Sequence, residues 1–314
     1  MSFKNFILLI ATLLMALFLL FYGEVGFTNN SELLWQIRVP KIVSCFFAGG
    51  MLATAGLLMQ IFFQNPLAGP DILGVSSGSS LFVALWMLVG ASLNPIFLSI
   101  GVSAMSFLGA MSVFALLLFL IHKNLSRVSL IIVGLLISSF ASSCISLLVN
   151  LSSASSLKNF LMWSMGSFRN LTLVDLPEFI FFSMLAIIPL IFIKKPLNQF
   201  LLSEHYAQSM GVNVKKMKYI FVTMAALMIS VVTHFCGPVG FIGIISPHLA
   251  RHFHKRSNLD QLLPASFFMG AISAFIAEII LVLLPESLIS VNAILGIIGA
   301  PLIVYFIAHQ RDLK

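Results

Sequence analysis

Residues 74–78 have the composition and spacing of a known nucleophile motif. They read Gly-Val-Ser-Ser-Gly, which satisfies the G-x-S-x-G pattern of serine hydrolases. That chemistry needs a strand before the serine, a helix after it, and histidine and acidic partners. A proline-containing loop precedes Ser76 instead, so we expect no catalytic residue here. An intramembrane hydrolase that uses Ser76, or the pair His248 and His252, is the alternative from another functional class.

A second candidate is a group of histidines near residue 250. His248 and His252 are four residues apart, as in a zinc-binding helix, and His254 follows. A zinc protease of the H-E-x-x-H type also needs a glutamate as general base, but Leu249 stands at that position. The basic residues beside these histidines are Arg251, Lys255 and Arg256. We therefore expect a cationic edge beside lipid headgroups, and no metal ligands.

The elements that would position these residues are membrane-spanning helices. The chain has 314 residues, of which 60% are hydrophobic and 9% charged, whereas soluble domains average about 25% charged residues. The apolar residues form continuous blocks of about 17–25, a length that crosses a bilayer core, and their continuity excludes a barrel. We predict an all-α polytopic membrane protein with one domain, 1–314. The expected spans are 6–22, 40–63, 72–90, 95–121, 128–150, 177–193, 216–236, 239–251, 264–284 and 291–308.

The distribution of basic residues predicts the topology. With the N-terminus inside, the basic residues on the outside are Arg38, Lys41, Lys158 and Arg169, out of 17 in the chain. This asymmetry follows the positive-inside bias, so we expect both termini in the cytoplasm. The net charge of +7 reports this topology and does not indicate a nucleic-acid partner. Two longer connections are predicted to hold a partial outer helix at about 158–168 and an inner helix at about 199–211.

The stretch from 62 to 80 breaks the helical pattern most firmly. Pro66 and Pro70 cannot continue a helix, because proline lacks the backbone donor and restricts the residue before it. The small residues that follow are Gly74, Ser76, Ser77, Gly78, Ser79 and Ser80. Small residues let helices approach closely, and broken backbone survives in a membrane only where protein or water satisfies it. Either a turn with a packing face or a rigid loop at the inner mouth of a pathway fits this pattern.

Three further features are open to two interpretations each. Glu278 is an acid deep inside a span. Inserting a charged side chain at such a position costs about 2.5–3.5 kcal/mol, so Glu278 should face protein or water. It could be polar lining of a conduit or a structural hydrogen-bonding group. Arg38 and Lys41 flank a proline at the outer end of a span, where they could anchor to headgroups or dock an acidic partner. The helical segment ending at Gly211, a candidate C-cap, could contact a soluble partner.

Several long segments resemble one family, the FecCD/BtuC-like permease subunits of bacterial ABC importers for iron–siderophores, haem and cobalamin. The segments are RVPK at 38–41, 48–80, SEHYAQSMGV at 203–212, GPVGFIGIISPHLAR at 237–251, LLPAS at 262–266 and LGIIGAPLIVYFI at 295–307. The resemblance runs nearly end to end. It implies the BtuC-like, type II importer fold with ten helices per subunit, and a chain that is not itself an enzyme.

The resemblance also implies roles for residues of this chain. Arg38 and Lys41 correspond to a basic pair that receives glutamates of an external substrate-binding protein. Residues 65–67, which are Asn65, Pro66 and Leu67, correspond to the cytoplasmic gate. The helix that couples to the ATPase corresponds to Glu204, Ala207, Ser209, Met210 and Gly211. Pathway or packing positions are Ser76, Ser77, Gly78 and Glu278.

The implied assembly has several partners. A second permease subunit, identical or not, completes the pathway, and two ATP-binding cassette subunits inside use ATP and Mg²⁺. This chain itself is expected to bind no cofactor. A binding protein delivers the ligand from outside, and the chain lies in the bilayer of a bacterial cytoplasmic (inner) membrane. A ferric siderophore is the expected cargo. Haem and cobalamin are the alternatives within the family, and a zinc or manganese permease of another importer family is a further one.

The chain departs from the family pattern at three places. Many members carry an arginine shortly after the acid of the ninth span, whereas Ile279 to Val282 follow Glu278 here. Lys41 replaces a usual arginine and cannot form the planar bidentate fork. Asn292 and Ser290 stand where glycine and proline are common, so we expect the outer end of the last helix to differ in shape.

Overall fold

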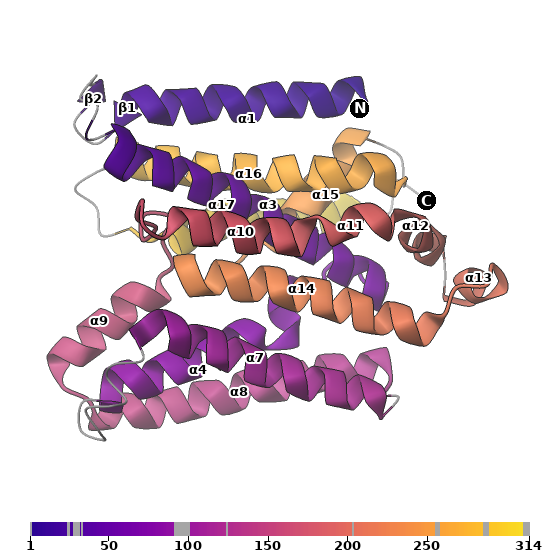
Figure 1. The fold of residues 1–314 in the computed structure, drawn as a ribbon, viewed down its shortest axis with the longest axis horizontal. Coiled ribbons are helices and arrows are strands. Elements are labelled where there is room, and N and C mark those ends of the chain that lie inside the picture. Colours follow the sequence, from indigo (N-terminus) through magenta and orange to yellow (C-terminus); the bar gives the residue numbers. More distant parts are fainter. Residues whose placement is uncertain are drawn as a thin grey trace.

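The computed structural model describes residues 2–23, 26–27, 32, 34–90, 101–123, 125–202, 204–254, 258–284 and 289–309. Its long helices lie side by side along one direction (Figure 1). The first part contains α1 (Phe3–Phe21), β1 (Tyr22–Gly23), β2 (Gly26–Phe27), the π-helix η1 (Leu34–Arg38), α3 (Val39–Phe63), the 3-10 helix η2 (Pro70–Leu73), α4 (Val75–Ala84) and the π-helix η3 (Leu85–Val89). The middle contains α7 (Gly101–His122), α8 (Arg127–Leu151), α9 (Ala154–Ser164), α10 (Leu176–Ile187), α11 (Pro189–Phe192), α12 (Lys194–Leu202) and α13 (Glu204–Ser209). The last part contains α14 (Val214–Cys236), α15 (Ile242–His254), α16 (Leu259–Leu283) and α17 (Val291–His309).

The predicted fold class, an all-α polytopic membrane protein, is confirmed. By length and composition, 6 helices of the described residues can cross a membrane, namely Phe3–Phe21, Leu34–Phe63, Gly101–His122, Arg127–Leu151, Val214–Cys236 and Leu259–Leu283. Shorter apolar helices lie at Val75–Val89, Leu176–Phe192 and Val291–Tyr305. The short span predicted at 239–251 corresponds to α15, with 13 residues. Residues 95–100 of the predicted span 95–121 lie outside the described residues.

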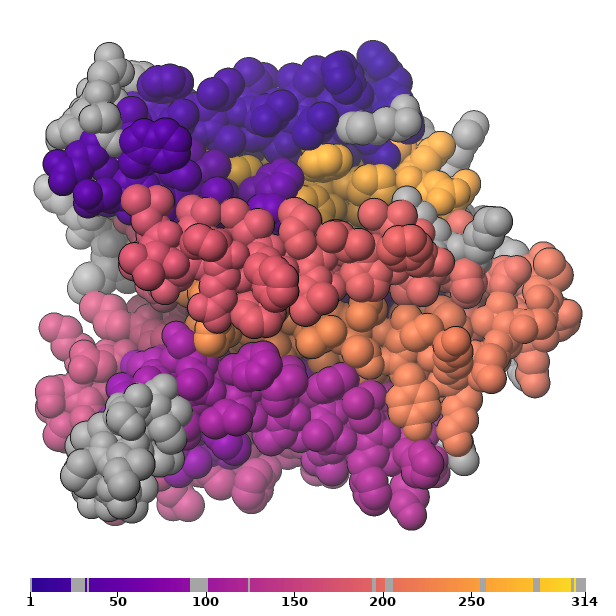
Figure 2. Space-filling model, in the orientation of Figure 1, coloured from indigo at the N-terminus to yellow at the C-terminus, as the bar shows by residue number. Residues whose placement is uncertain are grey.

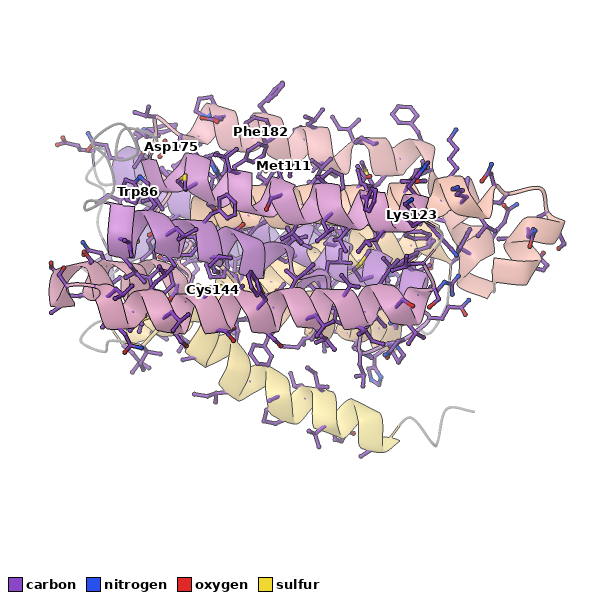
Figure 3. All side chains as sticks on the ribbon, turned by 90° about the horizontal axis from the view of Figure 1, so that it is seen from below. Trp86, Met111, Lys123, Cys144, Asp175 and Phe182 are labelled. Carbon is purple, nitrogen blue, oxygen red and sulfur yellow. The ribbon has the colours of Figure 1, made fainter. Side chains whose placement is uncertain are left out.

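The arrangement of the helices separates two ends of the molecule. α1 begins at the same end as α12 and α13, whereas α9 and the β1–β2 ribbon lie at the opposite end (Figure 1). Lys123 and Asp175 mark these two ends in the side view (Figure 3). α13 projects beyond the bundle (Figure 2). We call the end that carries α13 the inner end and the end that carries α9 the outer end, after the topology predicted from the basic residues, and which end faces the cytoplasm stays a prediction.

α3 forms the centre of the bundle. It is buried along most of its length and packs against α14, α15 and α16, whereas α1 and α8 are largely exposed. Glycines allow these contacts. A Cβ atom on Gly49 would overlap the backbone of Gly270 in α16, and one on Gly56 would overlap the carbonyl group of Gly243 in α15. Backbones this close gain dispersion contacts that larger side chains would prevent.

The ends of two predicted elements differ from the sequence-based expectation. The outer helix was predicted at 158–168, but α9 spans Ala154–Ser164, because the Ser153 hydroxyl accepts the Ser156 N–H and caps its start. The chain leaves this helix at Gly166, where φ is +68°. The inner helix predicted at 199–211 overlaps α12 and α13, and residue 203 between them lies outside the described residues. The two-residue strands β1 and β2, paired antiparallel, were not predicted.

Candidate pathway, gate and docking sites

The gate segment predicted at residues 65–67 is a tight turn after α3. Gln64 ends the helix in the left-handed region, with φ of +50°. The Ala68 N–H then donates to the Asn65 carbonyl at 3.0 Å, and the Leu67 N–H donates to the Asn65 side-chain oxygen at 2.9 Å. Pro66 lies at the second position of this turn, where its fixed φ is favoured. The sequence therefore builds a rigid turn, on which Asn65 and Leu67 are exposed.

Side chains from α3 and α15 surround this turn. The Pro66 carbonyl accepts a hydrogen bond from His248 Nε2 at 2.7 Å. One turn earlier in α3, the Gln60 side chain accepts a hydrogen bond from Arg251 and donates to the Ile244 carbonyl at 3.4 Å. These contacts join the inner end of α3 to α15 across more than 180 residues of sequence.

The small residues after the turn lie in helix contacts. Ser77 donates to Ser138 of α8 at 2.9 Å, and a Cβ on Gly78 would press on Gly109 of α7. Ser76 lies in the first turn of α4 and donates a long hydrogen bond, 3.5 Å, to Asp71. The short 3-10 helix η2, not a strand, precedes it. This geometry lacks the strand that a nucleophile elbow requires.

The histidine pattern of α15 separates into individual roles. His248 binds the gate turn, while His254 Nε2 contacts the side-chain oxygen of Asn5 in α1 at 2.6 Å. His252 is exposed. Within the described ranges, no group of three His, Cys, Asp or Glu side chains could hold a metal ion. Lys255 and Arg256, which the sequence placed in this cationic edge, lie outside the described residues.

A buried cluster of charges lies towards the outer side, and we call Lys41, Arg169 and Glu278 the outer charge cluster. Glu278 is 0% exposed, and its Oε1 atom lies 2.6 Å from Arg169 Nε and 3.6 Å from Lys41 Nζ. Its Oε2 atom has no hydrogen-bond partner among the described residues. Lys41 comes from α3, Glu278 from α16 and Arg169 from the segment after α9, so the cluster joins three elements.

The predicted docking pair has little access to solvent as placed here. Arg38 is 4% exposed and Lys41 is 5% exposed. The Arg38 guanidinium donates to the Leu20 carbonyl of α1 at 2.8 Å and lies against Gly23. Arg169, in contrast, has 34% of its side chain exposed. Sequence reasoning recorded Arg169 only as an outer basic residue. The sequence signal for a larger role was Glu278, because an acid inside a span needs a basic partner.

Asn292 links three segments at the outer end. Its side-chain oxygen accepts the Gly240 N–H at 2.9 Å, and its Nδ2 donates to the Met165 carbonyl at 2.9 Å and to the Pro238 carbonyl at 2.8 Å. The start of α17, the end of α9 and the loop before α15 are therefore tied together. A glycine, common at this position in the family, has no side chain to make these bonds.

The coupling segment forms a short capped helix. Gly211 has φ of +83°, and the N–H groups of Gly211 and Val212 return to the carbonyls of Gln208 and Ala207 at 3.0 Å each. This is the Schellman pattern, which confirms the predicted C-cap. Ala207 is buried, whereas Ser209 and Met210 are exposed, Met210 by 55%. Glu204 begins α13, but its side chain lies outside the described part of the structure.

α8 carries a polar face that sequence reasoning missed. Ser139, Ser143, Ser146 and Asn150 are all exposed, and their spacing of four, three and four residues places them on one helical face. The buried residues of α8, Leu130, Gly134 and Ala141, lie on the opposite face. The same outward face is apolar nearer the inner end, at Val128, Ile132 and Leu135. The signal was present in the sequence as serines at helical intervals within a span.

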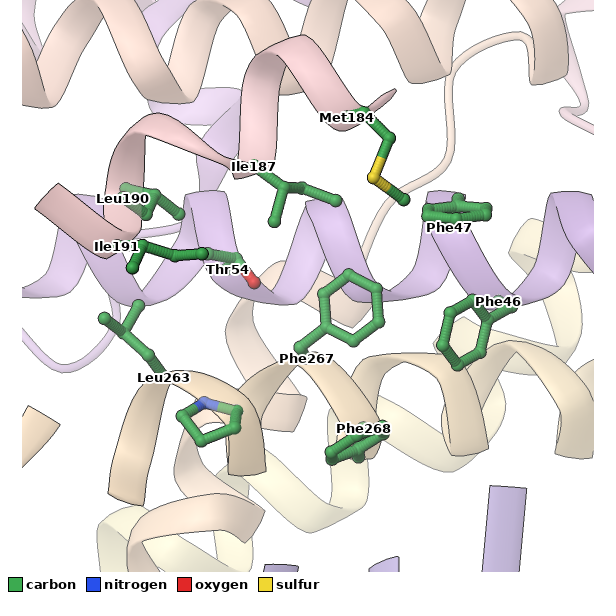
Figure 4. Close-up of a pocket in the computed structure, with 11 residues that line it drawn as sticks. Phe46, Phe47, Thr54, Met184, Ile187, Leu190, Ile191, Leu263, Phe267 and Phe268 are labelled. Atoms are coloured by element: carbon green, nitrogen blue, oxygen red, sulfur yellow. The ribbon is translucent and has the colours of Figure 1, made fainter. Parts of the chain in front are cut away.

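The described residues line cavities between the helices, two of which bear on the question of a pathway. One, of about 320 Å³, is lined by apolar side chains of α3, α10, α11 and α16, including Phe46, Phe47 and Phe267, with Thr54 as its polar member (Figure 4). Thr54 donates to the Gly50 carbonyl of its own helix. The other, of about 160 Å³, is polar and lies at the outer end between His234, Glu178 and Asp175. Neither contacts the gate turn.

These features define a class of protein, a polytopic helical membrane protein with a polar helix face and a tight turn at its inner end. The chain belongs to the FecCD transport family, whose family model matches residues 5–309. It is the permease of an ABC importer of the FecCD/BtuC type. The resemblance stated from the sequence motifs is confirmed.

Known proteins of this kind are similar along nearly the whole chain. A vitamin B12 import system permease protein, BtuC, from Serratia proteamaculans is 29% identical, with 89% of this chain and 83% of that protein covered. The hemin transport system permease protein HmuU from Yersinia pestis is 28% identical, with 91% and 87% covered. A solved metal-chelate type ABC transporter in an inward-facing conformation has a TM-score of 0.87 and 25% identity, covering 97% of this chain and 98% of that one.

Proposed function

We propose that this permease imports a metal complex of the ferric-siderophore type, delivered from outside by a binding protein and driven by two ATPase subunits. The observation that carries the proposal is the polar face of α8. α8 is long enough to cross the membrane and most of it is exposed, so its outward face meets lipid or another subunit. Serine and asparagine side chains at such a position favour a water-filled route over lipid.

The position of the polar residues suggests how the route is arranged. Ser139 to Asn150 occupy the outer half of α8, whereas the inner half of the same face is apolar. A second permease subunit facing α8 would enclose a polar vestibule open to the outside. The rigid turn at Asn65, Pro66 and Leu67 would close the inner end. We infer that two such turns, one from each subunit, form the cytoplasmic gate.

The chemistry of this face favours a large complex over a free metal ion. Its hydroxyl and amide groups are neutral and donate in part to their own helix, as Ser143 does to the Ser139 carbonyl. Free zinc or manganese would require carboxylate and imidazole ligands converging on one point. The described residues contain no such group of three. In a chelate the organic ligand already coordinates the metal, so the protein needs to supply only a weakly polar surface along the pathway.

The names of similar proteins support one chemical class of cargo, a metal held in a large organic ligand. Vitamin B12 and hemin, which the similar permeases are named for, each hold a metal in a large organic ligand. The similar solved structure is of the metal-chelate type. Ferric siderophores, which the sequence resemblance implies, are also metal chelates and are our proposed cargo. Haem and cobalamin are the alternatives.

The partners follow from the two ends of the molecule. α13 and the residue after it expose Tyr206 and Met210 beside the polar Gln208 and Ser209, a surface suited to a groove of a cytoplasmic ATPase. At the other end, the partly exposed Arg169 shares Glu278 with the buried Lys41, and a cation there suits an acidic binding protein. The chain would then lie in a bacterial inner membrane with both termini in the cytoplasm, and ATP and Mg²⁺ would bind the ATPase.

The cargo can be identified from the binding protein encoded beside this permease. Purified under iron-limited growth, that protein should retain a ferric complex, visible as a charge-transfer absorbance band and as an iron-containing mass. Membrane vesicles holding the assembled transporter should then take up ⁵⁵Fe from this complex only when ATP is supplied. A porphyrin or corrin spectrum in the binding protein would contradict the siderophore proposal in favour of haem or cobalamin.

A further inference from the structure

We infer that His248 is a positioning residue that fastens the cytoplasmic gate turn to α15, so that the turn moves with that helix. The inference rests on the proposed function, because it takes Asn65, Pro66 and Leu67 as the gate. It assigns a role to the histidine pattern of α15, which the transport mechanism otherwise leaves unused. The role is mechanical and involves no metal.

The hydrogen bond itself is specific. Pro66 has no N–H, so its carbonyl is the backbone polar group that this residue can offer to a partner. The acceptor is a carbonyl, so His248 Nε2 must carry the proton at a separation of 2.7 Å. His248 is 8% exposed. Water therefore competes little for this bond, and an unpaired ring nitrogen would be costly here.

The backbone hydrogen bonds of the turn are local. The Asn65 N–H returns to the Gln60 carbonyl at 3.2 Å, and the Ala68 N–H returns to the Asn65 carbonyl at 3.0 Å. These bonds fix the shape of the turn but not its position relative to other helices. The bond from His248 joins the turn to an element that lies 182 positions away in the sequence. It can therefore set where the tip, Leu67, stands.

α15 is itself fixed to the inner half of α3. A Cβ on Gly56 would overlap the Gly243 carbonyl, and a Cβ on Gly243 would overlap the Pro70 ring. Arg251 holds the Gln60 side chain, and Ile244 packs where a Cβ on Gly69 would lie. The inner part of α3, the turn and α15 therefore form one unit, with His248 as the connection nearest the tip.

Chain order relates this unit to the ATPase side. α13, the proposed coupling helix, leads through Val212 into α14, and α14 leads into α15. A displacement of α13 that reaches α15 would carry the turn with it while the His248 bond persists. Without that bond, the turn could stay closed or open independently of α15. The expected defect is loss of coupling, with the fold retained.

The test measures access to the gate tip and does not depend on the cargo. Leu67 is 39% exposed and is replaced by cysteine in a Cys144→Ser background, since Cys45 and Cys236 are buried. The full transporter, with its ATPase subunits, is prepared in inside-out membrane vesicles. A membrane-impermeant maleimide then reports how fast Leu67→Cys reacts from the cytoplasmic side, with and without ATP and vanadate.

We expect His248→Ala to raise the labelling rate in the closed state about fivefold, the population shift that losing one net hydrogen bond produces. His248→Gln, whose amide can donate from nearly the same place, should restore the slow rate. His252→Ala, on the exposed face of the same helix, should leave it unchanged. If His248→Ala fails to assemble, His248→Asn, which is too short to reach Pro66, should show the same rise.

Two outcomes would overturn the inference. The first leaves the gate assignment intact, and the second contradicts the gate assignment as well. If labelling changes with ATP but is identical in wild type, His248→Ala and His248→Asn, the gate stands and His248 does not position it. If Leu67→Cys is never labelled from the cytoplasm, in any nucleotide state, the gate assignment itself fails together with the role of His248.

Discussion

Glu278 shows how three charges can share one buried position. Its Oε1 atom contacts both Arg169 and Lys41, so the outer charge cluster holds two cations and one anion. Removing such charges from water costs several kcal/mol per ion, and only close pairing recovers it. About a third of the Arg169 side chain is exposed, so moving it away from Glu278 into solvent costs less free energy than moving the buried Lys41. Arg169 is thus the member best placed to meet an outside partner.

Neutralising this acid should destabilise the protein. Glu278→Gln keeps the shape of the side chain but leaves Lys41 and Arg169 without their counter-charge. Breaking a buried pair costs about 3–5 kcal/mol, and the exposure of Arg169 places our expectation at the lower end. Thermal unfolding of the purified protein in detergent measures the loss. Glu178→Gln, at an exposed acid, serves as the control, and an equal unfolding temperature for both variants would contradict the role of the cluster.

The need for this cluster was predictable from the sequence, but its members were not. A lone acid inside a span requires a partner, which left Glu278 as a candidate for a structural bond. Nothing in the sequence pairs it with Arg169, which lies 109 positions away. The burial of Arg38 could not be predicted from the sequence either, because it depends on a hydrogen bond to a backbone carbonyl of α1 and on the absence of a side chain at Gly23. The docking role of Arg38 and Lys41 stays a prediction.

Helix packing in this protein depends on glycines that meet glycines. Gly56 of α3 contacts Gly243 of α15, and Gly49 contacts Gly270 of α16. Along α3, the first pair lies nearer the gate turn and the second nearer the outer charge cluster. The packing therefore transmits position from one helix to the next, since a well-packed interface cannot compress.

A single methyl group should disturb this contact. Gly56→Ala places a Cβ on the Gly243 carbonyl, so α3 and α15 must separate and the His248 bond must lengthen. We expect a loss of about 1–3 kcal/mol, as for other overpacked sites. Gly240→Ala is the matched control, because nothing lies within 4 Å of its new Cβ. Unfolding temperatures of the two variants measure the difference, and equal values would be inconsistent with the close approach.

Asn292 should stabilise the outer ends of three elements. Asn292→Ala removes its bonds to Gly240, Met165 and Pro238 and leaves those backbone groups without that partner. At about 0.5–1.5 kcal/mol net per bond, we expect faster hydrogen exchange of residues 163–168 and 238–242. Asn150→Ala, which loses one bond within its own helix, is the control. Unchanged exchange in the Asn292 variant would show that the three segments are held by other contacts.

Element types were more predictable than element ends. Continuous apolar blocks predicted the spans, because hydropathy alone selects helices in a bilayer. The π-helical start of the second span, η1, has no local signal in the sequence. The departure at Asn292 was noticed, but its partners come from segments more than 50 residues away. Sequence reasoning could therefore predict a change there but not its form.

At the scale of the whole molecule, the two ends should face opposite sides of the membrane. α1 begins at the end that carries α13, and α9 lies at the other (Figure 1). Ser2→Cys and Ser155→Cys, in the Cys144→Ser background, should therefore react with an impermeant thiol reagent from opposite sides. Intact cells should label only Ser155→Cys, and inside-out vesicles only Ser2→Cys. Labelling of both from one side would contradict the topology.

α8 and α17 expose faces that the proposed second permease subunit could cover. The outward face of α8 is polar in its outer half, and α17 diverges from the bundle with exposed apolar residues such as Ile297 and Val304 (Figure 3). A second subunit against these helices would cover the apolar surface and enclose the polar one. This arrangement could not be predicted from span counting, because it depends on which face of each helix the chain leaves uncovered.

The most direct test compares two neighbouring positions of α8 in the assembled transporter. Ser146 belongs to the polar face, while Leu147, at nearly the same depth, points about 100° away from it. In the Cys144→Ser background, a water-soluble impermeant maleimide applied from outside should modify Ser146→Cys and leave Leu147→Cys unmodified. Equal modification of both positions, or modification of Leu147→Cys alone, would contradict a water-filled route along this face.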